Sequence, residues 1–100
     1  MPVVPPGGRR FVRAPGVRLA PLGEAWVAFS AVSGETHVLN DEGVAILELL
    51  DVALPLPASA VGQRLADEVG LPAAELAVTL EGAWGPLIDA GLVREHRPGP

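Results

Sequence analysis

Short apolar runs separated by glycine and proline dominate the first half of the chain. Val17 and Leu19 alternate with more polar neighbours, and residues 25–29 are apolar on both faces, as expected for a central strand. Gly34 favours a turn, and residues 35–39 contain the strand-forming Thr and Val. The pattern predicts a three-stranded antiparallel sheet.

The second half predicts three helices. Asn40 is placed as an N-cap, with two carboxylates in the first turn and an almost continuously apolar stretch behind it. A second helix is expected over about residues 58–68, and a third begins at Pro72 and ends at Gly91. The predicted fold class is therefore α+β, a winged-helix-like domain with an N-terminal three-stranded sheet followed by three helices.

One feature disagrees with an uninterrupted third helix. Gly82, Gly85 and Pro86 lie inside its apolar stripe, and a proline within a helix costs about 3 kcal/mol. The clash of the proline ring falls on residue i−4, which is Gly82. We expect a bend between Gly82 and Pro86.

Composition sets the expected limits of the domain. Residues 1–13 are rich in Pro, Gly and Arg and predict a flexible arm with a short strand at residues 10–13. The folded domain is expected over residues 14–93, which leaves residues 94–100 as a flexible tail. One hundred residues leave no room for a second domain.

Charge and residue content exclude several classes of function. The chain has no cysteine, which removes disulfides, thiolate catalysis and sulfur-ligated zinc. No signal peptide or membrane span is apparent, so we expect a cytoplasmic protein without a membrane partner. The net charge is −5, and residues 19–93 contain Arg64 as their only basic residue apart from histidine, so nucleic acid is not an expected partner.

The local sequence resembles the PqqD family, whose members are peptide chaperones also called ribosomal-peptide recognition elements. The resemblance covers residues 14–93 and depends mainly on Leu39-Asn40, the AILELL segment at residues 45–50 and the terminal Gly91-Leu92. The turn at residues 33–37 is similar to PqqD-like proteins encoded beside an HPr-kinase-related protein. No catalytic motif contributes to this likeness.

The resemblance implies a function and a site. PqqD-like domains bind the leader of a precursor peptide as an added strand and present it to a modifying enzyme, here an HPr-kinase-related protein by the narrower resemblance. The site residues that it implies lie on the third strand and on the third helix: Glu35, Thr36, His37, Val38, Leu39, Leu76, Thr79, Leu80, Ala83 and Trp84. A proline at Val38 is expected to remove a donor from the strand's hydrogen-bond ladder.

The candidate catalytic and metal-binding residues are few. His37 and His96 lack further ligands, so no metal or other cofactor is expected. Ser33, His37 and Asp41 supply the residue types of a hydrolase triad, but the strand spacing separates Ser33 from His37 and no nucleophile-elbow pattern is present. We therefore expect a binding protein and not an enzyme.

Two alternatives remain open at this stage. The basic residues of the arm, Arg9 to Arg18, could bind nucleic acid or an acidic partner. The chain could also be a winged-helix protein-interaction or transcription-associated domain, a homodimer through its sheet edge. Against DNA binding, the third helix carries Glu75, Glu81 and Asp89 and no arginine.

Overall fold

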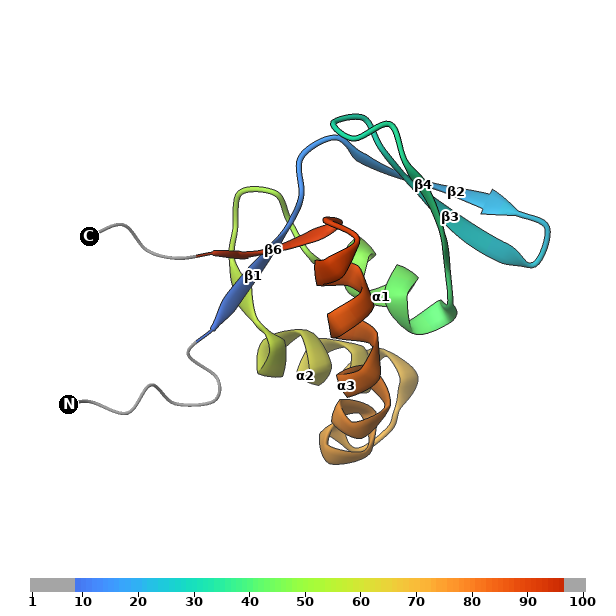
Figure 1. The fold of residues 1–100 in the computed structure, drawn as a ribbon. Coiled ribbons are helices and arrows are strands. Elements are labelled where there is room, and N and C mark those ends of the chain that lie inside the picture. The colour runs from blue at the N-terminus through green and yellow to red at the C-terminus, as the bar shows by residue number, and fades with distance from the viewer. Residues whose placement is uncertain (1–8, 97–100) are drawn as a thin grey trace, which may run out of the picture.

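The sheet predicted from the first half of the chain is present. In the computed structural model, β2 (Val17–Leu22), β3 (Ala25–Ser30) and β4 (Thr36–Leu39) pair antiparallel in that order (Figure 1). The turn between β3 and β4 closes through Gly34, whose φ of 76° suits glycine. β3 is the central strand, which leaves one side of β4 without a partner strand among residues 9–96.

The three predicted helices follow. They are α1 (Asp41–Leu49), α2 (Ala58–Val69) and α3 (Ala73–Asp89). The Asn40 side chain accepts a 2.9 Å hydrogen bond from the Gly43 N–H, so the predicted N-cap of α1 is confirmed. α3 packs against both α1 and α2 and forms the centre of the helical layer.

A second sheet joins the two ends of the described chain. β1 (Arg10–Arg13) lies between β5 (Leu56–Pro57) and β6 (Val93–His96), antiparallel to both. The Arg9 Nε donates a 2.7 Å hydrogen bond to Glu95 Oε1 beside this pairing, and the bond and the carboxylate's charge raise the pKa of Arg9. Figure 1 shows β1 and β6 side by side although they come from opposite ends of the chain.

This second sheet corrects the expected arm and tail. The short strand expected at residues 10–13 is confirmed as β1, but it belongs to the folded domain and not to a flexible arm, and residues 94–96 form most of β6 instead of a tail. The reason is non-local pairing, which gives four-residue strands a partner that local sequence patterns do not reveal. The structure describes residues 9–96, so the remainder of the predicted arm and tail lies outside the described residues.

The molecule is a small α+β domain with two antiparallel three-stranded sheets and three helices. The order of elements differs from a sheet followed by three helices, because β5 precedes α2 and β6 follows α3. No helix within residues 9–96 is long and apolar enough to cross a membrane.

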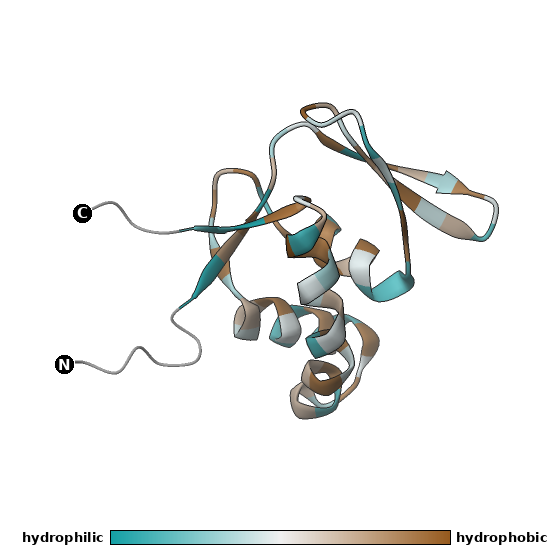
Figure 2. Ribbon diagram, in the orientation of Figure 1, coloured by the Kyte–Doolittle hydropathy of each residue, from teal (hydrophilic) through white to brown (hydrophobic). Residues whose placement is uncertain are grey.

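The core lies where the helices meet the two sheets. Apolar residues occur along all three helices and at the start of β6 (Figure 2). Ile46, Leu47 and Leu92 are completely buried, and Phe11 of β1 joins them at 5% exposure. A cluster that draws on α1, β6 and β1 shows that the second sheet belongs to the same core as the helices.

α3 continues through its internal proline. Pro86 lies three residues before the end of the helix, and Gly82 and Gly85 are part of the same element. The helical assignment is thus unbroken where a bend was expected. Pro86 has no N–H, so the Gly82 carbonyl lacks the donor that an α-helix normally supplies at i+4.

Candidate functional site

β4 is an edge strand with one row of free backbone groups. The Ser30 N–H donates a 2.9 Å hydrogen bond to the Glu35 carbonyl, which makes Ser30 and Glu35 a hydrogen-bonded pair. Such pairs alternate along an antiparallel ladder. His37 and Leu39, opposite Ala28 and Trp26, therefore bond to β3.

The intervening residues of β4 face the other way. Thr36 and Val38 lie opposite Phe29 and Val27 in non-hydrogen-bonded positions. Their N–H and C=O groups point away from β3, toward the edge that has no partner strand. The register set by the turn directs the Val38 N–H outward, so a proline at Val38 would remove a donor to an added strand and not a donor to β3.

An apolar groove lies beside this free edge. It has a volume of about 380 Å³ and is bounded by β4, the start of α1 and α3. Its lining residues are Val38, Leu39, Asn40, Gly43, Gly82, Ala83, Pro86 and Leu87. Val38 is 72% exposed although it lines the groove, so it lies at the groove's open edge.

Small residues keep the groove open. A Cβ at Gly43 would lie 3.1 Å from Asn40 Oδ1 and 3.6 Å from Leu87 Cδ2, which means that β4, α1 and α3 approach closely there. A Cβ at Gly82 would meet no atom within 4 Å. Both glycines line the groove, Gly43 at a close approach of these elements and Gly82 beside open space.

The structure brings together part of the predicted site. Val38, Leu39 and Ala83 line the groove beside β4. Thr79 is exposed and its hydroxyl donates a 3.3 Å hydrogen bond to the Glu75 carbonyl, and Leu76 packs partly buried against the core. Glu35, Thr36 and His37 belong to or adjoin β4 without lining the groove.

Leu80 and Trp84 lie elsewhere. They line a larger groove of about 690 Å³ between α2 and α3, together with Gly62, Ala77 and other small residues. The Trp84 ring also packs 5.0 Å from the Phe11 ring, at an interplanar angle of 36°. These two side chains therefore contact α2 and β1 rather than the space beside β4.

Sequence reasoning missed the groove residues Asn40, Gly43, Gly82, Pro86 and Leu87. The signal that could have found three of them is helical spacing, because Pro86 and Leu87 follow Ala83 at i+3 and i+4, and Gly82 precedes Pro86 by four residues. The predicted set followed the apolar side chains of α3. The face beside β4 carries Gly and Pro instead.

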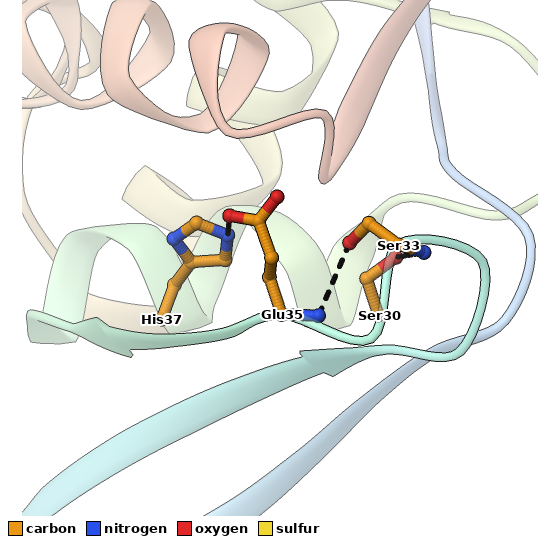
Figure 3. A network of polar contacts seen from close by, with 4 residues as sticks. All are labelled: Ser30, Ser33, Glu35 and His37. Carbon is orange, nitrogen blue, oxygen red and sulfur yellow. Dashed lines mark hydrogen bonds and ion pairs between the residues drawn. The ribbon is translucent and has the colours of Figure 1, made fainter.

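His37 and the β3–β4 turn form a small polar network. Figure 3 shows the Glu35 and His37 side chains on the same side of β4, and Glu35 Oε2 lies 3.7 Å from His37 Nε2. His37 Nε2 is buried without a hydrogen bond. The Ser33 hydroxyl accepts a 3.2 Å hydrogen bond from the Glu35 N–H, so it caps the turn.

The described residues contain no group of three or more His, Cys, Asp and Glu side chains placed to hold a metal ion. Comparison of the chain with protein-family models, curated proteins and solved structures finds no match. The interpretation of the site therefore depends on its own geometry and on the resemblance carried by the sequence.

Proposed function

We propose that this chain is a peptide chaperone that binds a precursor peptide by strand addition at β4 and presents it to a modifying enzyme. The observation that carries the proposal is the free edge of β4, where the backbone groups of Thr36 and Val38 point outward directly beside an apolar groove. An added strand would complete these hydrogen bonds and insert alternate side chains into the groove.

The resemblance to PqqD-like chaperones supports this proposal independently of the groove. In that family the leader adds to the edge strand that precedes the helices, and β4 occupies this position in the chain. We extend the proposal to a winged-helix-like classification, in which the pairing of β1 with β6 after α3 forms the wing. The enzyme partner in this proposal is an HPr-kinase-related protein.

The first test uses the direction of the Val38 N–H. Val38→Pro removes a donor to the added strand and leaves the hydrogen bonds between β3 and β4 intact, a position where an edge strand tolerates proline. Val38→Ala is the matched control, because it shortens the same side chain and keeps the N–H. We expect the proline variant to lose binding of a precursor peptide encoded beside the gene, and the alanine variant to retain it.

Amide NMR of the labelled protein provides the measurement. In the wild type, peptide should shift the signals of Thr36 and Val38 and of the groove residues Gly43, Gly82 and Leu87. The spectrum of Val38→Pro without peptide shows whether the variant is folded. Tight binding by a folded Val38→Pro, or shifts confined to other surfaces, would refute strand addition at this edge.

A second test fills the groove. Gly82 lines it and Gly85 does not, and a Cβ at either position would meet no atom within 4 Å. Leucine is a good helix former, so Gly82→Leu should remain folded, whereas the Cδ of Pro86 disfavours a helical side chain at Gly85. Circular dichroism must therefore show that Gly85→Leu is folded before the two variants are compared. We expect only Gly82→Leu to weaken peptide binding, and equal affinities for the two variants would exclude the groove from the site.

A further inference from the structure

Carboxylates stand at both ends of the β4 edge. Glu35 precedes the strand, which ends at Leu39, and Asp41 and Glu42 follow after Asn40. The Glu35 and Asp41 residues are exposed. A strand added along β4 would therefore meet negative charge at each end of its path.

The helix on the other side of the groove repeats this arrangement. Glu75, Thr79, Gly82, Pro86 and Asp89 follow one another at spacings of four, three, four and three residues, which places them on one stripe of α3. All five are exposed. Because Gly82 and Pro86 line the groove, the stripe begins and ends with a carboxylate on the groove side.

Among the described residues, the elements that flank the groove carry no arginine or lysine, and His37 beside Glu35 is their only basic side chain. Neither residues 35–49, which include β4 and α1, nor residues 73–89 of α3 contain arginine or lysine. The middle of the stripe adds a partial negative charge, since the Gly82 carbonyl lacks its helical donor at Pro86. Hydrogen-bond donors and positive charge would satisfy these groups.

We infer that the peptide bound along β4 is cationic, with arginine or lysine residues on both sides of a short aliphatic centre. The centre would occupy the apolar groove. Because α3 runs opposite to β4 (Figure 1), the flanking basic residues would approach Glu35 and Asp89 at one end and Asp41 and Glu75 at the other. An acidic peptide would meet like charges at both ends. This inference rests on the proposed function, because it assumes that the peptide adds to β4.

Selection from a random library tests the composition of the ligand without knowledge of its identity. A display library of random 12-residue peptides is selected on the immobilised full-length protein and, in parallel, on Val38→Pro. Some selected peptides should bind the wild type but not Val38→Pro. We expect these peptides to carry Arg or Lys on both flanks at about twice the library frequency or more. Neutral or acidic flanks in these peptides would overturn the inference.

Neutralising the stripe tests the charges themselves. The first double variant is Glu75→Gln/Asp89→Asn. Loss of the Glu75 carboxylate near the start of α3 should destabilise the helix, and loss of the Asp89 carboxylate near its end should stabilise it, so the fold should be retained. Asp67→Asn/Glu68→Gln on α2 removes the same charge away from the groove. The readout is the Kd of the best library peptide, measured by fluorescence anisotropy.

We expect the α3 double variant to weaken binding about threefold or more, since an exposed ion pair contributes up to about fivefold in affinity. The α2 double variant should bind as the wild type does. Equal losses in both variants would overturn the inference, because they would reflect net charge alone.

The failure of the inference differs from the failure of the proposed function. Peptides that depend on the Val38 N–H but carry no basic flanks would refute the inference and leave strand addition standing. If no selected peptide depends on Val38, strand addition fails and the inference fails with it.

Discussion

At the scale of single residues, β4 divides its backbone groups between two sides. The pairing of Ser30 with Glu35 places His37 and Leu39 in bonded positions and leaves Thr36 and Val38 at the open edge. In the protein without peptide, the amides of Thr36 and Val38 should exchange with solvent much faster than those of His37 and Leu39. Hydrogen exchange followed by NMR measures the four rates, and equal protection along the strand would contradict this register.

The direction of the Val38 N–H could not be predicted from the sequence. The composition of residues 35–39 identified the strand, and Gly34 identified the turn. Which amides face β3 depends on the hydrogen bond that closes the turn, and a shift of one residue would reverse every assignment. The hydrophobic pattern of β4 does not reveal that register, because the apolar Val38 is exposed and the polar His37 is half-buried.

At the scale of elements, α3 contains an internal cost to stability. Pro86 removes one hydrogen bond from the helix at the groove, and the residue is exposed. We expect Pro86→Ala to raise the free energy of unfolding by about 1 to 3 kcal/mol, because alanine restores the donor to the Gly82 carbonyl. Urea denaturation monitored by circular dichroism measures the change.

Pro72 is the matched control for this substitution. It occupies the N-cap of α3, where its missing N–H would not have an intrahelical partner in any case. Pro72→Ala should bring no comparable gain. A loss of stability in Pro86→Ala would show that the ring contributes packing at the groove that exceeds the cost of the missing bond.

The two phenylalanines report on the two sheets. Phe11 of β1 is 5% exposed and its ring contacts Trp84, while Phe29 of β3 is 41% exposed on the outer face. Phe11→Ala should lower the free energy of unfolding by about 3 to 5 kcal/mol. Phe29→Ala should cost less than about 1 kcal/mol. Similar losses in urea denaturation would contradict the assignment of β1 to the core.

The elements differ in how far the sequence determines them. The sheet of β2, β3 and β4 and the three helices follow from local signals such as Gly34, Asn40 and the helical spacing of apolar residues. β1, β5 and β6 have at most four residues each and exist through pairing across the chain. The rotation of α3 against β4 is also non-local, which is why Leu80 and Trp84 were assigned to the other groove.

At the scale of the whole molecule, the second sheet holds both ends of the chain on the helical core. β1 pairs with β6 over four residue positions, and the Ala14 N–H donates a 2.9 Å hydrogen bond to the Leu92 carbonyl. The proposed binding edge at β4 lies in the other sheet. Its position relative to α3 depends on a core that both sheets complete.

The boundaries of the folded unit give the last prediction. A fragment of residues 14–93 follows the limits expected from the sequence, but it lacks β1 and all of β6 except Val93. Loss of Phe11 alone should cost about 3 to 5 kcal/mol, and a small domain has only about 5 to 15 kcal/mol in total. The 14–93 fragment should therefore be largely unfolded at 25 °C, whereas residues 9–96 should give a cooperative urea transition and bind peptide. Equal stability of the two fragments by circular dichroism would mean that the β1–β6 pairing contributes little to the fold.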